Sequence, residues 1–307
     1  MTPFTPPTAD QLLAIRVNAG IDELARTERF AHAEPDLVEA IVEGVGQFAA
    51  GEFAPLNRKG DLEGAKLENG VVRLPDGFEA AYHAYVEQGW NAIASPVAHG
   101  GQGLPFALSC NVLENLGAAN MAFTLLPMLS VGAIEALEHH GSPAQQAMYL
   151  PKLVSGAWSG TMNLTEPAAG SDVGALRSTA EPIEDGAHAG KFKITGQKIY
   201  ITWGEHDLAE NIIHLVLARL PGAPEGSRGI SLFVVPKYHV NADGSLGPRN
   251  DLRCVSLEHK LGINASPTCV MSYGDNGECI GELVGAPNKG LAAMFTMMNN
   301  ARINVGN

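Results

Sequence analysis

Residues 162–172 read Met-Asn-Leu-Thr-Glu-Pro-Ala-Ala-Gly-Ser-Asp, and this stretch decides how the fold of the chain is interpreted. It leads from an apolar run at 158–164, which predicts a strand, into a loop of small residues around Pro167 and Gly170. Small residues let the backbone approach a flat ligand closely, and the hydroxyls and free N–H groups of such a loop can face a bound molecule. The stretch therefore predicts a ligand-binding loop at a strand end.

This stretch and a later one resemble the acyl-CoA dehydrogenase family, whose usual flavin-binding signature is Thr-Glu-Pro-x-Ala-Gly-Ser-Asp. The signature is matched by Thr165, Glu166, Pro167, Ala169, Gly170, Ser171 and Asp172. Residues 196–202, Gly-Gln-Lys-Ile-Tyr-Ile-Thr, are similar to the family's Gly-x-Lys-x-aromatic-Ile-Thr/Ser strand. Shorter likenesses occur at 140–142, 149–156, 260–263 and 290–302, so the resemblance covers roughly residue 79 to the last residue.

Two further features point to a branch within that family. The N-terminal extension before residue 79 is long, as in the larger-subunit subgroup. Residues 204–208, Gly-Glu-His-Asp-Leu, resemble the branch that acts on methylthio-propanoyl-CoA (3-methylmercaptopropionyl-CoA) and related thioesters. The resemblance thus implies a short or sulfur-containing acyl chain.

The composition is that of an acidic, folded protein. With 307 residues, 45% of them apolar, the chain can bury a core and hold two domains. A net charge of −13 argues against nucleic acid and an anionic membrane surface as partners. The four cysteines have neither Cys-x-x-Cys nor zinc-ligand spacing, which predicts reduced thiols and no metal site.

No targeting or membrane-spanning segment is expected. The N-terminus lacks a basic region followed by an apolar one, so no signal peptide is evident and the predicted location is cytoplasmic. The uncharged run at 121–134 is short and contains Pro127, which favours a buried core helix over a membrane span.

Residues 1–156 are predicted to form an all-α N-terminal domain. Apolar residues recur at helical spacing over 10–21 and after Pro35, Gly77 and Pro105. Ser142 and Pro143 mark a further helix start, with Ser in the capping position. The predicted core faces are Leu37, Ile41, Val42 and Val45; Phe78, Tyr82 and Tyr85; and Leu108, Val112, Leu113 and Leu116.

Residues 157–286 are predicted to form a middle β domain with an antiparallel barrel or sandwich architecture, which makes the fold class α+β. Short alternating runs broken by Gly, Pro and Asn are typical of such folds. The predicted strands are 158–164, 176–180, 191–195, 199–202, 212–218, 230–235, 252–257, 268–272 and 279–284.

Residues 287–307 are interpreted as the start of a truncated C-terminal helical domain. Helical spacing returns at residue 288, with Leu291, Met294, Phe295, Met298 and Ile303 on one apolar face. Nothing downstream covers that face. The resemblance implies a four-helix domain at this place in full-length relatives.

The resemblance implies a bound FAD and the α,β-dehydrogenation of an acyl-CoA thioester. Leu164 and Thr165 would lie along the flavin pyrimidine edge through backbone N–H groups and the Thr hydroxyl. Tyr200 corresponds to the aromatic beside the flavin ring, Ile201 follows it, and Thr202 corresponds to the group near flavin N5. Ser171 matches a position that helps to bind phosphate and pantetheine. Met162 departs from the aromatic that many relatives have.

The residues alone leave ordinary alternatives open. Thr165 also suits a plain strand, and Ser171 also suits a turn cap. Tyr200 and Thr202 are residue types that an edge strand of a barrel favours. Arg302 matches a basic residue near the catalytic carboxylate of relatives, and equally suits a solvated helix surface.

The catalytic base is not expected within this chain. Residues 288–307 contain no Asp or Glu, and Ala301 occupies the position that a minority of relatives use for the base. Glu166 and Asp172 are predicted to cap turns or pair locally. The chain alone is therefore expected to bind FAD weakly, if at all, and not to turn over.

The resemblance also implies partners. These are an acyl-CoA substrate, electron-transfer flavoprotein as the electron acceptor, and further copies of the full-length chain in a homo-oligomer. The alternative is a non-catalytic binding or interaction module that keeps the scaffold, which the missing base favours and the intact flavin motifs disfavour.

Overall fold

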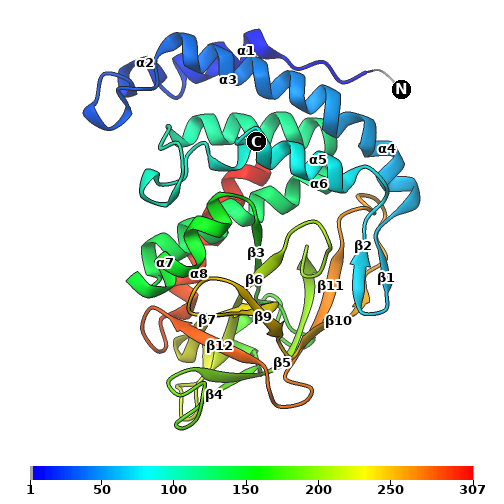
Figure 1. Ribbon diagram of the computed structural model, residues 1–307, viewed down its shortest axis with the longest axis vertical. Coiled ribbons are helices and arrows are strands. Elements are labelled where there is room, and N and C mark those ends of the chain that lie inside the picture. The colour runs from blue at the N-terminus through cyan, green and yellow to red at the C-terminus, as the bar shows by residue number, and fades with distance from the viewer. Residues whose placement is uncertain (1–2, 307) are drawn as a thin grey trace.

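A computed structural model describes residues 3–306, so the predicted domain limits at residues 1 and 307 lie outside the described residues. Helices gather at one end of the molecule and strands at the other (Figure 1). The helices are α1 Thr8–Val17, α2 Ile21–Leu24, α3 Pro35–Phe48, α4 Ala54–Glu63, α5 Phe78–Glu87, α6 Phe106–His140, α7 Pro143–Val154 and α8 Gly290–Gly306. This arrangement confirms the predicted α+β fold class.

The strands lie between α7 and the final helix α8 in the chain, apart from one early hairpin. They are β1 Lys66–Glu68, β2 Val71–Arg73, β3 Trp158–Asn163, β4 Thr179–Pro182, β5 Phe192–Thr202, β6 Asn211–Arg219, β7 Ile230–Pro236, β8 Tyr238–Val240, β9 Leu246–Arg249, β10 Leu252–Leu257, β11 Thr268–Tyr273 and β12 Ile280–Val284.

Helix α6 is the central element of the helical end. It is a pair of helices joined at Asn120, whose backbone has φ −159° and ψ 86°. Within residues 3–306 it is the one helix long and apolar enough to cross a membrane, but 67% of its most apolar stretch is buried in the fold. The run at 121–134 therefore lies in a core helix, as predicted.

The sequence signals for the helices mostly hold. Phe78, Tyr82 and Tyr85 are all at most 4% exposed, and so are the predicted residues of the first half of α6. Leu37 is 40% exposed instead, because α3 turns Val38 into the core. At the start of α7, Ser142 Oγ accepts the Gln145 N–H and the Gln145 side chain accepts the Ser142 N–H, which completes a capping box.

The predicted face of α8 is right for Met294, which is buried, and for Leu291 and Met298, which pack against the core, but wrong for two residues. Phe295 and Ile303 are 40% and 51% exposed. The buried stripe consists of Gly290, Ala293, Met294, Met297, Asn300 and Asn304. The stripe contains small and polar residues because α8 packs closely against α6. A Cβ at Gly132 of α6 would be 3.0 Å from Met297 Cγ of α8. Apolar counting missed it because two of its members are Asn.

The main sheet closes on itself, which confirms the barrel expectation. β5 pairs with β12, β12 with β7, β7 with β6, and β4 joins β6 back to β5. β3 extends the sheet beyond β6, while β11 and β10 extend it beyond β5. Buried side chains of these strands, with Cys254, Cys269 and Cys279, fill the barrel.

The expectation of a purely antiparallel sheet needs correction. β3 pairs with β6 in parallel over six residue pairs, and β4 meets β6 in parallel at Thr179 and Arg219. Strand β6 is buried at every position up to Ala218, because helices cover one face and the barrel interior the other. A strand buried on both faces loses its alternation, so its pairing direction is not readable from sequence.

A hairpin, β1 and β2, interrupts the residues that were predicted to be all helical. Its turn is Asn69-Gly70, with left-handed φ values of 52° and 80°. Asn-Gly is the preferred pair for a two-residue hairpin turn, so the sequence carried a signal that the helix interpretation overlooked. Val72 from this hairpin contributes to the core of the barrel. A second hairpin, β8 with β9, was also missed.

Candidate functional site

The loop after β3 is folded tightly around one four-residue turn. The backbone N–H of Glu166 donates to the carbonyl of Ala169, and the N–H of Ala169 donates back, each at 3.0 Å. Pro167 and Ala168 lie exposed at the tip of this turn. These two hydrogen bonds hold the ends of the turn together.

Three consecutive residues of the loop are tied to two consecutive residues of β5. The Lys198 ammonium donates to the Leu164 carbonyl at 3.1 Å and to Glu166 Oε1 at 2.7 Å. Between these contacts, the Ile199 N–H donates to the Thr165 carbonyl at 2.9 Å. The structure thus brings the two stretches that carried the family resemblance into direct contact.

Glu166 is a saturated, buried carboxylate. Besides Lys198, Oε1 accepts the Ser178 hydroxyl at 2.6 Å and the Ser178 N–H at 3.1 Å, and Oε2 accepts the Arg177 N–H at 2.6 Å. Burial raises the pKa of Glu166, but Lys198 and these donors outweigh it, so the pKa lies below its ordinary value. Glu166 is paired, as predicted, but its partners are not local: Arg177, Ser178 and Lys198 lie 11, 12 and 32 residues along the chain. These bonds leave the carboxylate unsuited to accept a substrate proton.

Lys198 is fully buried. Burial lowers its pKa to about 8, against the opposing effect of Glu166. Gly196, two residues earlier, passes so close to Ser178 that a Cβ would lie 2.2 Å from Ser178 Oγ. The glycine and lysine of the 196–202 stretch are therefore both explained by the same packed contact with the loop.

The outward side of the loop carries donors without protein partners. Within residues 3–306, the Leu164 and Thr165 N–H groups and the Thr165 hydroxyl donate no hydrogen bond. Both residues are half-buried. The backbone N–H groups of 170–174 are unpaired in the same sense, and Ser171 is exposed among them. Unpaired N–H groups that follow one another in a turn are suited to negatively charged ligand atoms.

β5 is distorted where these donors end. It is one continuous strand, not the two that were predicted, and it carries a bulge: Cys269 of β11 faces Ile201, but Met271 faces Lys198. Tyr200, within the bulge, has a left-handed φ of 59° and is 59% exposed. A bulky residue held in this conformation stores strain of about 1–3 kcal/mol, and such strain concentrates at functional sites.

The remaining predicted residues of β5 divide between the two sides of the sheet. Ile201 is 2% exposed and belongs to the barrel core, so only its backbone can face a ligand at the surface. Thr202 is half-buried, and its carbonyl accepts the Thr161 hydroxyl at 2.8 Å. Tyr200 and Thr202 therefore lie beside the loop that carries Leu164 and Thr165.

Trp203 anchors the end of β5 to the helices. It is fully buried with a left-handed φ of 54°, and its indole N–H donates to the Ala122 carbonyl at 3.2 Å. Its ring stacks on Phe123 with 6.2 Å between centroids. Ala122 and Phe123 follow the break in α6 at Asn120, so the break helps to position the strand end.

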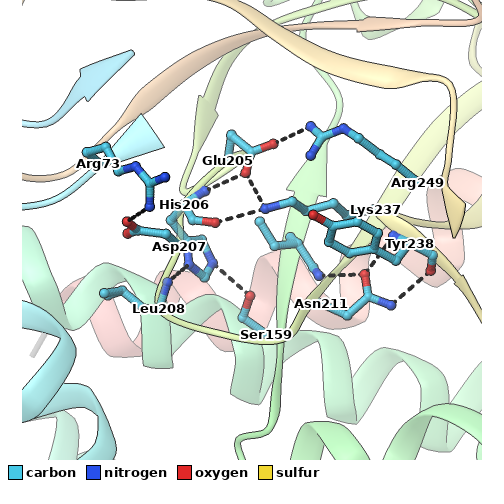
Figure 2. A network of polar contacts seen from close by, with 11 residues as sticks. Arg73, Ser159, Glu205, His206, Asp207, Leu208, Asn211, Lys237, Tyr238 and Arg249 are labelled. Atoms are coloured by element: carbon cyan, nitrogen blue, oxygen red, sulfur yellow. Dashed lines mark hydrogen bonds and ion pairs between the residues drawn. The ribbon is translucent and has the colours of Figure 1, made fainter. Parts of the chain in front are cut away.

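A buried polar network follows directly, and sequence reasoning missed its role (Figure 2). Glu205, fully buried, pairs with Lys237 through Oε1 and with Arg249 through Oε2, the latter at 2.7 Å. The sequence of residues 204–208 shows only a family likeness, because the partners of Glu205 come from the β7–β8 connection and from β9, far along the chain.

His206 completes this network as a neutral side chain. Nδ1 accepts the Leu208 N–H at 3.2 Å, so Nε2 carries the proton and donates to Ser159 Oγ at 2.9 Å. Burial, then Lys237, lowers the pKa of His206 well below its ordinary value. Figure 2 also shows Asn211, whose side-chain amide donates to the Tyr238 carbonyl and accepts the Tyr238 N–H, next to Lys237. β5 thus has a buried ion cluster on each side of its bulge.

Two predicted residues stand apart from this constellation. The Asp172 carbonyl, not its carboxylate, accepts the Ala175 N–H and starts a short 3-10 turn. Arg302 is exposed on α8, and its guanidinium contacts Asn299 and Phe295 of its own helix. In the part of the chain that the structure describes, no three His, Cys, Asp or Glu side chains are grouped to hold a metal ion.

Comparison with known proteins covers almost the whole chain. Residues 36–157 match the family described as "Acyl-CoA dehydrogenase, N-terminal domain", and residues 161–275 match "Acyl-CoA dehydrogenase, middle domain". The likeness therefore begins well before residue 79, where the sequence resemblance was placed.

Individual relatives agree with these matches. The chain is 50% identical over 303 residues to a 3-methylmercaptopropionyl-CoA dehydrogenase of Ruegeria pomeroyi, covering 99% of this chain and 50% of that protein. It is 40% identical over 262 residues to a butyryl-CoA dehydrogenase of Syntrophomonas wolfei, covering 83% and 42%. A Bacillus anthracis acyl-CoA dehydrogenase solved with FAD shares the fold, with a TM-score of 0.69 at 22% identity, covering 89% and 41%. The chain spans about half the length of the curated relatives it matches.

Proposed function

The chain belongs to the acyl-CoA dehydrogenase family, and on that premise we propose that it forms the flavin-facing part of an FAD-dependent enzyme that oxidises an acyl-CoA thioester between its α and β carbons. The observation that carries the proposal is the row of unpaired donors at Leu164 and Thr165. They lie beside a strained, exposed aromatic on β5. FAD, when bound, would accept the hydride that leaves the β carbon.

The loop residues fit the pyrimidine edge of a flavin. That edge gains negative charge during reduction, and preorganised N–H and O–H donors stabilise developing charge. The Leu164 N–H, the Thr165 N–H and the Thr165 hydroxyl are such donors, because their own backbone is already held by Lys198 and Ile199. Tyr200 would pack beside the ring, and Thr202 would reach the region of N5, with Ile201 contributing backbone only.

Ser171 would hold the polar arm of the substrate or cofactor. It is exposed within the unpaired N–H groups of 170–174, which suit phosphate and the amides of pantetheine. With a formal charge of −13, this protein needs local donors to meet an anionic acyl-CoA. The naming of the Ruegeria relative supports a short acyl chain with a thioether sulfur as the substrate class.

We place the proton-abstracting base outside these 307 residues. The Glu166 carboxylate is saturated by Lys198, Ser178 and Arg177, and Glu205 is buried between two cations. Arg302 would support the base from the surface of α8. The 307 residues alone would then bind FAD without turnover, and the whole enzyme would be a homo-oligomer that passes electrons to electron-transfer flavoprotein.

The three proposed domains follow one another along the chain. Residues 1–156 would form a helical domain, 157–286 the middle domain with the flavin contacts, and 287–307 the beginning of a further helical domain. The unpaired donors fall in the second of these parts.

The test is flavin retention by the purified chain. After incubation with excess FAD and removal of the free cofactor, the chain should show the visible absorption of oxidised flavin. Thr165→Val should raise the Kd for FAD by about three- to tenfold, the value of one hydrogen bond. Thr179→Val, an exposed strand threonine, is the matched control and should leave the Kd unchanged.

A folded chain that takes up no FAD at any concentration would overturn the flavin site proposed for it. Acyl-CoA should not bleach flavin held by this chain in the absence of oxygen, because the base lies elsewhere. Bleaching would show that a carboxylate among these residues serves as the base after all.

A further inference from the structure

We propose that Lys198 and Glu166 are positioning residues: their ion pair fixes the spacing between the loop at 164–166 and the strand at 198–202. The inference rests on the proposed function, because these two segments carry the proposed flavin contacts. Neither side chain would touch the flavin, since both are buried beneath the segments they join. The pair would act through the donors of Leu164 and Thr165.

The geometry of the crosslink singles out Thr165. A single ammonium, that of Lys198, holds the residue before it through the Leu164 carbonyl and the residue after it through the Glu166 carboxylate. The carbonyl of Thr165 itself is held by the Ile199 N–H at 2.9 Å. The two carbonyls and the carboxylate on the inner side of the loop are therefore all hydrogen-bonded. This fixes the direction in which the N–H and hydroxyl of Thr165 point outward.

Burial gives the pair little freedom. Lys198 is 0% exposed and Glu166 is 6% exposed. Ser178 and Arg177 occupy the remaining acceptor positions of the carboxylate, so the Glu166 carboxylate cannot rotate without losing several bonds at once. A buried ion pair is weak as a source of stability, and fixing one arrangement of nearby elements is a role for which such pairs are retained in some proteins.

The chain offers a matched control near the other end of the same strand. Lys191, one residue before β5, pairs with Glu282 at 2.8 Å, with side chains 37% and 29% exposed. Removing that charge changes the same residue type beside the same strand, but far along it from the bulge. Lys191→Met therefore separates loss of a lysine ion pair in general from loss of this crosslink.

The first experiment needs no flavin. Hydrogen exchange is compared in the 307-residue chain and in Lys198→Met, Lys191→Met and the double variant Glu166→Gln/Lys198→Met. The double variant leaves no unpaired buried charge and so guards against a single variant that fails to fold. The Ile199 amide should exchange at least tenfold faster in Lys198→Met and in the double variant, while amides of β6 and β7 stay protected. Unchanged exchange at Ile199 in the folded double variant would overturn the proposal.

The second experiment measures FAD affinity on the same variants. The double variant should recover thermal stability relative to Lys198→Met, yet keep a Kd for FAD at least tenfold above that of Lys191→Met. Recovery of both together would mean that the pair only supports folding, which overturns a positioning role. Failure of the unsubstituted chain and of Lys191→Met to bind FAD would count against the proposed function, and the exchange at Ile199 would still decide the crosslink.

Discussion

At the scale of single residues, the sequence singled out exposed residues of the candidate site but not the buried partners behind them. The exposure of Tyr200 and the partly open position of Thr165 follow from a motif whose spacing is local. The saturation of Glu166 depends on Ser178 and Lys198, which only folding brings together. The pairing of Glu166 could therefore be predicted as local capping or pairing, but its partners could not be named.

His214 is a second residue whose state depends on distant neighbours. It lies in β6, fully buried, and Nδ1 is 3.1 Å from the Tyr273 hydroxyl. Burial first, then Lys237 and Arg249, lowers its pKa from 6.5 to about 3. Nothing in the local sequence of an apolar strand indicates such a shift, because both cations come from later in the chain.

Acid should destabilise the protein through His214. As pH falls below 6.5 the unfolded chain binds a proton that the folded chain refuses, so the free energy of unfolding falls by up to about 1.4 kcal/mol per pH unit until the folded pKa of about 3 is reached. Urea unfolding at about pH 7 and about pH 5 measures this loss. In His214→Gln the loss should be smaller by about 2 kcal/mol, and an equal loss in both proteins would contradict the assignment.

At the scale of elements, hydrophobic periodicity and turn residues predicted the features that depend on neighbouring residues in the sequence. Tertiary contacts decided the other features. The helices with broad apolar faces formed as expected, whereas α8 buries Asn300 and Asn304 on a face chosen by close contact with α6. The sequence predicts two strands where β5 is one, because Gly196, Gln197 and Lys198 separate its two apolar runs, although Lys198 is buried in the structure. In the proposed flavin site, the bulge would expose Tyr200, and the buried charge of Lys198 would hold the loop beside it.

The cluster around Glu205 should be costly to break. Glu205→Gln leaves Lys237, which is 4% exposed, without its carboxylate. An uncompensated buried charge should lower the free energy of unfolding by about 3–5 kcal/mol. Urea denaturation gives the value. Glu39→Gln is the control, because its pair with Arg16 is about half exposed on both sides, and it should cost less than about 1 kcal/mol. Equal stability of the two variants would show that Lys237 finds another partner.

At the scale of the whole molecule, the two ends share one core. A single buried cluster runs from α3 and α6 through β3, β6 and β7 to α8. The sequence indicated the change from helical to strand pattern near residue 157, but it could not show how closely the ends would meet. That contact is set by Gly160 of β3, where a Cβ would lie 2.4 Å from the Ala133 Cβ of α6.

A methyl group at Gly160 should force β3 and α6, and with them the strand and helical ends of the molecule, apart. Gly160→Ala is expected to lower the free energy of unfolding by about 1–3 kcal/mol, the usual cost of overpacking a close contact. Differential scanning calorimetry would show a lower Tm. Gly262→Ala adds the same methyl where no atom lies within 4 Å, so its Tm should stay the same. A normal Tm for Gly160→Ala would mean that the sheet and α6 can slide past each other.

The shared ammonium of Lys198 has a consequence for protein engineering. A designer who transplanted residues 164–172 into another scaffold would bring a carboxylate whose cation resides in a separate part of the chain. Such a graft would contain the motif residues but not the Lys198 ammonium, and the Glu166 carboxylate would then be buried without a cation. The two stretches are thus one transferable part, and they should be inherited, swapped or redesigned together.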